Sequence, residues 1–360
     1  MPPVIRFIAK ILSVFISVFL LLFALAVGAF VYANSPPPAG PREGEGLRLE
    51  EDGSVLLEVR RGESSLSVGK RLEESGIIRT RYLWHLLSYF KKEYIKSGSY
   101  RLEIPAKQTA IHALLVQGRQ MLVRVTVPEG ITLKKAARIF EDSGICGAGD
   151  FLQAAADREI LDWYRVPGET MEGCLFPDTY LFPKDYPADR VIRAMADNFF
   201  LRLEAFSGPA GSPALLPPDE LYRAVILASI VEREYRVDEE APLMAGVFYN
   251  RLRIGMALQS CATVEYVITE IQGKPHPETL YTRDTEIRDP YNTYLRPGLP
   301  PGPICSPGAV ALDAVFNPAS SEFLYFRLID PQAGRHYFSR TLDDHIRAGV
   351  FYLKGSGSRP

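Results

Sequence analysis

The fold is decided by PPDELYRAVILASIVERE, residues 217–234. Two prolines and two acidic residues at its start are typical of a first helical turn. The apolar residues that follow fall on nearly every face of a helix, and a helix that is apolar all round is a buried one. This stretch therefore predicts a central helix ending in Glu232, Arg233 and Glu234, with carboxylates at the edge of an apolar interior.

A carboxyl group at such a helix end is suited to acid–base chemistry. Desolvation raises its pKa, and an acid that donates a proton near neutral pH needs that shift. A solvated helix end with an exposed Glu–Arg pair is the alternative. Periodicity does not choose between Glu232 and Glu234, because residues two apart on a helix point about 200° away from each other.

Two segments after this helix carry side chains typical of a sugar-binding site. They are APLMAGVFYNRLRIGMALQS, residues 241–260, and YNTYLRPGLPPGPICSPG, residues 291–308. Proteins bind neutral saccharides by hydrogen bonds and by stacking on ring faces. We therefore predict a carbohydrate site, although each residue alone is more often structural. The candidate binding residues are Tyr249, Asn250, Arg251, Gln259, Tyr291, Asn292 and Tyr294.

The N-terminus carries an apolar run without charge, ILSVFISVFLLLFALAVGAFVYA, residues 11–33. A bilayer-spanning helix takes about 20 residues. Arg6 and Lys10 precede the run, so the positive-inside rule predicts that residues 1–10 are cytoplasmic and that the rest of the chain lies outside. A cleaved signal peptide is the alternative, although the run is longer than a signal's apolar core. The Pro/Gly-rich segment 34–46 predicts a short, stiff linker.

Composition narrows the classes of partner. Lys and Arg total 41 and Asp and Glu total 43, so the chain has no surplus of positive charge. Its composition therefore does not favour nucleic-acid binding. Four cysteines without a CxxC spacing favour neither a zinc site nor a disulfide scaffold. The spacing of His336, Asp343, Asp344 and His345 matches no metal-ligand pattern, and we interpret them as structural hydrogen-bonding residues. We expect no metal and no cofactor.

Two segments resemble each other without a gap, VRRGESSLSVGKRLEESGI at residues 59–77 and VPEGITLKKAARIFEDSGI at residues 127–145. Each predicts a strand, a Gly turn, a Ser or Thr that caps an amphipathic helix, and a Ser-Gly stop. Small modules of this kind, LysM-like ones among them, bind aminosugar polymers. They also serve as spacers, and the sequence leaves both roles open.

Five segments resemble, in the same order, the motifs of the endolytic murein transglycosylases, the MltG or YceG-like family. The resemblance covers residues 50 to 350. The segments are EGCLFPDTY (172–180), LASIVERE (227–234), VFYNRLRIGMALQS (247–260), YNTYLRPGLPPGPICSPG (291–308) and LYFRLIDPQAGRHYFSRTLDDH (324–345).

The resemblance implies an α+β fold in three parts: a single transmembrane helix, a LysM-like subdomain at residues 47–125, and a mixed α/β catalytic domain at residues 126–354. It implies an enzyme of the cell, or inner, membrane whose catalytic domain is extracytoplasmic. Its substrate would be the β-1,4 bond between N-acetylmuramic acid and N-acetylglucosamine in peptidoglycan glycan strands. Cleavage would leave 1,6-anhydromuramic ends and stop the elongation of nascent strands, beside peptidoglycan synthases as partners.

The family's acid/base is the second glutamate of its ExE motif, and Glu234 occupies that position. The resemblance, not the periodicity, makes this choice over Glu232. One carboxylate would suffice, because the C6 hydroxyl of the muramic sugar is a nucleophile already tethered to the substrate. Glu172 and Asp178 in the first motif are candidates for orienting substrate or for structural hydrogen bonds.

Cysteines mark the departures from the family pattern. Cys174 stands where the family usually has an aromatic residue, Cys305 replaces a polar residue, and Cys261 replaces an aspartate, followed by Ala262 for a proline. Together with Cys146 they leave the disulfide pairing open, and a catalytic thiol is not favoured. Two rival hypotheses remain: a membrane-anchored, non-catalytic peptidoglycan-binding scaffold, and a muramidase that uses water.

Overall fold

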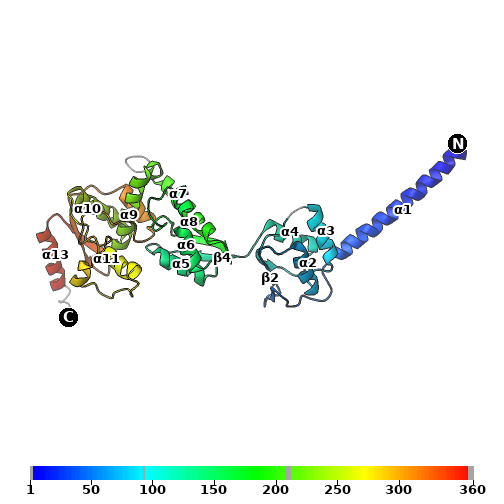
Figure 1. The fold of residues 1–360 in the computed structure, drawn as a ribbon, viewed down its shortest axis with the longest axis horizontal. Helices are drawn as coiled ribbons and strands as arrows, with labels where there is room; N and C mark the ends of the chain where they lie inside the picture. Colours follow the sequence, from blue (N-terminus) through cyan, green and yellow to red (C-terminus); the bar gives the residue numbers. More distant parts are fainter. Residues whose placement is uncertain (1–2, 92–93, 207–211, 356–360) are drawn as a thin grey trace. The chain divides into compact units, whose positions relative to one another are not determined.

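The computed structural model describes residues 3–91, 94–206 and 212–355 (Figure 1). The chain forms two compact units, Met1–Leu122 and Val123–Pro360. Helices and strands occur in both, so the predicted mixed α+β class is confirmed. Each unit is built around its own cluster of buried apolar side chains.

The first unit consists of a long apolar helix and a small α/β body. Its three-stranded sheet has the order β1-β2-β3 with antiparallel neighbours, and Leu57 of β2 pairs with Tyr100 of β3. The buried residues of β2 alternate along the strand and pack with Leu72, Trp84 and Leu115 from the helices. The elements are α1 (Pro3–Asn34), β1 (Leu47–Leu49), β2 (Val55–Val59), α2 (Ser65–Glu74), α3 (Arg81–Lys91), β3 (Gly98–Leu102) and α4 (Gln108–Gln117).

Helix α1 is long and apolar enough to cross a bilayer over Lys10–Asn34. These 25 residues reach about 37 Å, more than the roughly 30 Å of a hydrocarbon core. The helix therefore fits the predicted single-pass anchor. Its C-terminal end is fixed to the body, because the Asn34 side chain accepts a hydrogen bond of 2.9 Å from the backbone N–H of Thr109 in α4.

The predicted linker, residues 34–46, lies along this body and is hydrogen-bonded to it. The Arg79 guanidinium donates to the carbonyl oxygen of Pro36 at 2.7 Å and lies 4.3 Å above the centre of the Tyr32 ring. Farther on, the backbone N–H of Arg42 donates to the Ser75 carbonyl oxygen at 2.8 Å. The chain is thus held from the last turn of α1 to the start of β1.

The duplicated strand–helix pattern is confirmed, with one copy in each unit. Ser64 caps α2 and Thr132 caps α5 (Leu133–Asp142), each side chain accepting from a backbone N–H three residues on. Both helices end at the predicted Ser-Gly stop, where Gly76 and Gly144 adopt φ of +67° and +66°, a conformation that favours glycine. A common local sequence therefore gives a common local structure in two different surroundings.

The second unit surrounds α9, the predicted central helix. In Figure 1, α5 to α8 lie together at one end of this unit and α9 to α13 at the other. The elements after α5 are α6 (Ala148–Ala155), α7 (Arg158–Trp163), β5 (Thr179–Pro183), α8 (Ala188–Ala205), η1 (Pro213–Leu215), α9 (Pro218–Glu234), η2 (Asp238–Glu240), α10 (Ala241–Arg253), α11 (Cys261–Tyr266), η3 (Val267–Ile271), η4 (Thr282–Glu286), α12 (Ala309–Phe316), β6 (Tyr325–Asp330), β7 (Arg335–Ser339) and α13 (Leu342–Gly355).

Every residue of α9 from 225 to 231 is buried, so the prediction of a buried helix is confirmed. Helices α10 and α12 pack against it. Strand β4 (Leu122–Thr126) pairs with β5, and β6 pairs with β7 in an antiparallel hairpin that contacts α13. The loop that precedes β5 packs its apolar side chains into the core, among them Met171 and Phe176.

Two helical glycines should respond oppositely to replacement by alanine. A Cβ at Gly69 in α2 would lie 2.5 Å from Trp84, whereas a Cβ at Gly149 in α6 meets nothing within 4 Å. Gly69→Ala should lower the free energy of unfolding of the first unit by about 1–2 kcal/mol, since overpacking outweighs helix propensity. Gly149→Ala should raise the free energy of unfolding of the second unit by about 0.4–1 kcal/mol, since alanine restricts the unfolded chain and fits without a clash.

Urea unfolding followed by tryptophan fluorescence measures both effects, because Trp84 lies in the first unit and Trp163 in the second. A stabilising Gly69→Ala would contradict the close packing of α2 on α3.

Candidate active site

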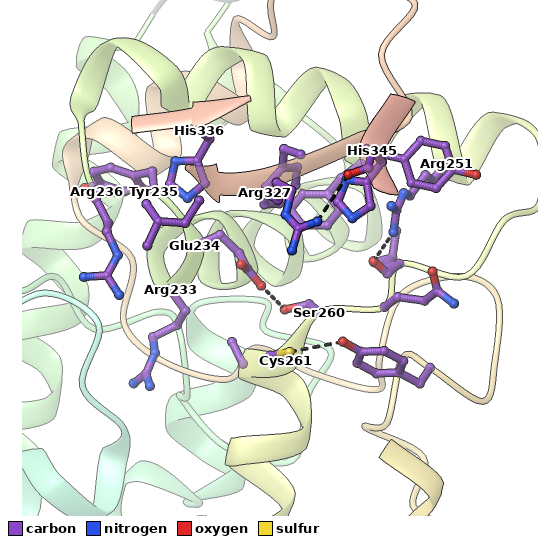
Figure 2. A pocket seen from close by; sticks show the side chains of 18 of the residues that line it. Arg233, Glu234, Tyr235, Arg236, Arg251, Ser260, Cys261, Arg327, His336 and His345 are labelled. Carbon is purple, nitrogen blue, oxygen red and sulfur yellow. Dashed lines mark hydrogen bonds between the residues drawn. The ribbon is translucent and has the colours of Figure 1, made fainter. Parts of the chain in front are cut away.

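The C-terminal end of α9 opens into a pocket of about 670 Å³. Its walls come from the end of α9, α10, the segment that leads into α11, the β6–β7 hairpin and α13. Figure 2 shows His336, Arg327 and His345 on one side of Glu234, and Ser260 and Cys261 on the other. The pocket thus joins parts of the chain that are far apart in sequence.

Glu234 is the last residue of α9, and its carboxylate borders this pocket. The Ser260 hydroxyl donates to Glu234 Oε1 at 2.5 Å (Figure 2). Burial raises the pKa of Glu234, and the negative charge of Glu265 raises it further, whereas the Ser260 hydrogen bond and the charges of Arg233 and Arg251 lower it. Burial outweighs the rest, so the carboxyl is better able to hold a proton than a solvated glutamate.

Glu232 lies in a different environment although it is only two residues away. Its Oε2 accepts a hydrogen bond of 3.0 Å from the backbone N–H of Gly308, which precedes α12, and it does not line the pocket. Burial raises its pKa to about 7, and the charge of Glu129 adds to the effect. The structure therefore distinguishes two glutamates that periodicity could not, and it is Glu234 that faces the pocket.

Ser260 is held by a set of buried hydroxyl groups. Its backbone N–H donates to Thr293 Oγ1 at 3.1 Å, and its carbonyl oxygen accepts from the Thr263 hydroxyl at 2.8 Å. Thr263 and Thr293 also lie 2.9 Å apart, hydroxyl to hydroxyl. The preceding Gln259 has φ of +51°, a left-handed conformation that costs a residue with a Cβ about 1 kcal/mol or more. This local network aims the Ser260 hydroxyl at Glu234.

Arg251 links two walls of the pocket. Its Nε donates to the carbonyl oxygen of Leu324, just before β6, and one terminal nitrogen donates to that of Leu258, both at 2.6 Å. The guanidinium also lies 5.2 Å from the centre of the Tyr325 ring. The residue is 7% exposed, so its charge contributes to the pocket from a buried position.

The β6–β7 hairpin and α13 supply cationic and imidazole groups. His336 Nδ1 lies 2.8 Å from the carboxylate of Glu240, which also accepts the backbone N–H of His336. Both side chains of this pair are buried. Arg327 donates to the carbonyl oxygen of His345 at 3.2 Å. Burial lowers the pKa of His345, and the charge of Arg327 lowers it further, which favours the neutral imidazole.

Cys261 lines the pocket beside Tyr294, with Sγ and the phenol oxygen 3.1 Å apart (Figure 2). Burial raises the pKa of the Cys261 thiol, and nearby carboxylates add to the effect. The thiol is therefore a poor nucleophile at neutral pH. Within the described residues all four cysteines are free.

Four of the predicted site residues line the pocket, and five do not. The lining residues are Glu234, Arg251, Gln259 and Tyr294. The amide of Asn250 donates to the carbonyl oxygens of Ser321 and Phe323, and the amide of Asn292 donates to those of Thr285 and Ile287. These two amides satisfy backbone groups of irregular segments, and their placement gives no support to the predicted sugar contacts.

The other three predicted residues lie elsewhere in the second unit. Tyr249 donates its hydroxyl to the Val315 carbonyl oxygen and lines a separate, largely apolar pocket. Tyr291 packs against Tyr266, with ring centres 5.0 Å apart. Glu172 is buried and accepts the backbone N–H of Leu133, the first residue of α5, on both oxygens at 3.1 Å. Of its two predicted roles, this geometry favours structural hydrogen bonding.

Several pocket residues were not predicted. Ser260 directly follows the predicted Gln259, and this adjacency is the sequence feature that could have identified it as a pocket residue. The sequence predicts a structural role for the histidines. The pair of His336 with Glu240 fits that role, but His336 also lines the pocket. The unpredicted residues that line it include Arg233, Ser260, Glu265, Tyr325, Arg327, His336 and His345. Among the described residues no group of three or more His, Cys, Asp or Glu side chains could hold a metal ion.

Comparison with known proteins finds a matching family and several relatives of this chain. Residues 57–349 match the model of the YceG-like family. An endolytic murein transglycosylase of Bacillus subtilis (strain 168) is 26% identical over 349 residues, covering 92% of this chain and 92% of that protein. One of Streptococcus pneumoniae serotype 2 is 26% identical over 81% of this chain, and the match spans 57% of the pneumococcal protein. A crystal structure of a YceG-like protein from Listeria monocytogenes has a TM-score of 0.53 and 26% identity, covering 82% of this chain and 98% of that one.

Replacing Ser260 should change the titration of Glu234. The hydroxyl donates to the carboxylate and stabilises its charged form, so Ser260→Ala should raise the Glu234 pKa further. NMR titration of protein labelled at the glutamate carboxyl carbons measures the shift, with Glu234→Gln assigning the signal. Thr269→Ala is the control, because that hydroxyl donates to the Glu265 carbonyl oxygen instead. An unchanged Glu234 pKa in Ser260→Ala would refute the hydrogen bond.

Glu172 should make the folded state less stable as pH rises. Burial raises its pKa from 4.5 to about 8, so the folded protein retains a proton that the unfolded chain loses. This contribution to stability is complete below about pH 4.5 and is lost as pH approaches 8. Between pH 5 and 8 the free energy of unfolding of the wild type should fall by on the order of 3 kcal/mol more than that of Glu172→Gln. Urea unfolding across this range tests it, and parallel curves would contradict the buried acid.

Proposed function

The chain belongs to the YceG-like family, and we propose that it is an endolytic lytic transglycosylase that cuts peptidoglycan glycan strands with Glu234 as acid/base. Its relatives from Bacillus and Streptococcus bear the name endolytic murein transglycosylase, which supports an enzyme of this class. The bond that we propose is the β-1,4 linkage between N-acetylmuramic acid and N-acetylglucosamine.

The observation that carries the proposal is the setting of Glu234. A carboxyl group with a raised pKa borders a pocket of about 670 Å³, a size that suits a small ligand or a few sugar units. The Ser260 hydroxyl fixes one carboxylate oxygen. The other oxygen is then available to exchange a proton with substrate.

In the reaction Glu234 gives one proton to the substrate and takes one proton back from it. Glu234 donates its proton to the glycosidic oxygen, and the bond from that oxygen to the muramic C1 breaks as positive charge develops on the sugar. The C6 hydroxyl of the same sugar attacks C1, and the Glu234 carboxylate accepts its proton. The products are a free N-acetylglucosamine hydroxyl and a 1,6-anhydromuramic end, and the acid is regenerated.

This route asks for no second catalytic carboxylate, because the internal hydroxyl replaces both water and an enzyme nucleophile. Glu265 is the other carboxylate that lines the pocket near Glu234, and it is paired with Arg233 at 3.0 Å. This ion pair with Arg233 occupies the Glu265 carboxylate. Glu265 therefore acts through its charge, which favours the protonated form of Glu234.

The pocket walls offer contacts of the kind that sugars use. Tyr294 and Tyr325 contribute aromatic side chains to the lining, and Gln259 contributes an amide. Arg251 holds the walls through backbone carbonyl oxygens. We assign substrate contact to these lining residues and a supporting role to Tyr249, Asn250, Tyr291, Asn292 and Glu172.

The membrane helix places this chemistry outside the cytoplasm in our proposal. Arg6 and Lys10 lie at the N-terminal end of α1, before its uncharged run, so the positive-inside rule puts the chain after α1 outside, where peptidoglycan lies. The first unit has β2, α2, α3 and β3 in succession with β2 antiparallel to β3, an arrangement that supports a LysM-like, glycan-binding module. Cutting close to the membrane would end the elongation of nascent strands, beside the synthases that make them.

Glu234→Gln should abolish cleavage, because an amide cannot donate and recover a proton. Full-length protein acting on purified sacculi should lose roughly a hundred- to ten-thousand-fold in the release of 1,6-anhydromuramic ends, measured by mass spectrometry. Glu232→Gln is the matched control, since its amide oxygen can still accept from Gly308, and it should stay close to wild type.

The products separate this proposal from its rivals. Reducing muramic ends from the wild type would indicate a muramidase that uses water. No cleavage by a folded wild type would indicate a non-catalytic scaffold. Full activity in Glu234→Gln with loss in Glu232→Gln would overturn the assignment of the acid.

A further inference from the structure

Helix α3 carries an apolar stripe that faces solvent. Tyr82, Leu86, Tyr89 and Phe90 recur at helical spacing, and they are 76%, 49%, 71% and 72% exposed. Trp84 on the opposite face is buried in the core of the first unit, and Leu83, at the side of the stripe, is buried as well. The helix is therefore apolar on two faces, and only one of them is used in packing.

Such a stripe is unusual on a water-exposed helix. Single exposed apolar residues are normal, but a contiguous row on one face marks a surface that binds something apolar. Tyr94, three residues beyond the end of α3 in the sequence, is 89% exposed as well. Three of the four exposed aromatic residues named here are tyrosines. Tyrosine is typical of the interface between lipid and water.

The end of the membrane helix lies beside α3. Both belong to the first unit, and the C-terminal end of α1 contacts α3 and α4. The Arg79 guanidinium covers the ring of Tyr32 in the last turn of α1, and Tyr82 follows only three residues later, a span of at most about 11 Å. The stripe therefore begins close to the depth at which α1 leaves the bilayer.

Charge at the start of α3 fits the same surface. Arg79, which is hydrogen-bonded to Pro36, precedes the helix, and Arg81 begins it. The Arg81 guanidinium lies 5.9 Å from the centre of the Tyr82 ring and 3.5 Å from the Glu73 carboxylate. Basic residues beside aromatic ones bind the anionic headgroups that line a bilayer while the rings enter the acyl boundary.

We propose that the exposed face of α3, defined by Tyr82, Leu86, Tyr89 and Phe90, docks into the outer lipid–water interface beside the anchor. The first unit is then attached to the membrane twice, by a spanning helix and by an interfacial one. The occupant of this surface is the bilayer itself, because α1 brings it there. The inference rests on α1 spanning the membrane and not on the catalytic proposal.

Short-range fluorescence quenching by lipid tests the docking. Full-length Tyr89→Trp protein is inserted into vesicles of phosphatidylethanolamine and phosphatidylglycerol, with or without lipid brominated near the top of the acyl chain. The new tryptophan should enter the acyl boundary, so its loss of fluorescence should exceed that of the control by about twofold or more. The control is Glu51→Trp, at the exposed turn between β1 and β2.

Phe19→Trp, in the middle of the apolar helix, reports whether α1 itself spans the bilayer. Wild-type protein, with Trp84 and Trp163, sets the background quenching. Quenching above this background in Phe19→Trp and Tyr89→Trp, but not in Glu51→Trp, supports the proposal. Quenching at Phe19→Trp with Tyr89→Trp no more quenched than the control overturns it and leaves α3 to bind a protein. Absence of quenching at Phe19→Trp overturns the proposal together with the anchor. Release of anhydro products is measured separately and bears only on the catalytic proposal.

Discussion

The site depends on one constraint, the burial of α9 up to its last turn. Residues 225–231 are buried on all sides by α10, α12 and the loops around them, so the helix cannot rotate or slide without opening the core. Its last residue is thereby fixed at the border between apolar interior and pocket. The raised pKa of Glu234 is a consequence of this position, and the Ser260 hydroxyl moderates it.

Two acids on one helix illustrate how position decides chemistry. Glu232 and Glu234 are both desolvated. Glu232 accepts a hydrogen bond from the backbone N–H of Gly308 at the start of α12, whereas Glu234 accepts one from the Ser260 hydroxyl at the pocket. The first links two helices and the second faces a space that substrate can enter. Two carboxyl groups whose pKa values are both raised by burial can thus have unlike roles, and a raised pKa alone does not identify a catalytic group.

The local features could be predicted from sequence because their causes are local. The buried helix, the apolar N-terminal helix and the capped helices of the two repeats each follow from periodicity and cap residues, and all were found. The pocket walls could not be predicted in this way, since Ser260 meets Glu234 only through the packing of distant segments. The roles of Asn250 and Asn292 stay predictions, because an amide suits a sugar and a backbone carbonyl group equally well, and in this structure both amides donate to backbone carbonyl oxygens.

Arg251 has a consequence for the dimensions of the pocket. Two nitrogens of one guanidinium hold the carbonyl oxygens of Leu258 and Leu324, which belong to different walls, and the fork of the guanidinium is planar and rigid. The width between those walls is therefore set by the size of a chemical group and not by the balance of many weak contacts. A lysine has no such fork, so the distance between these two walls of the pocket depends on a single arginine side chain.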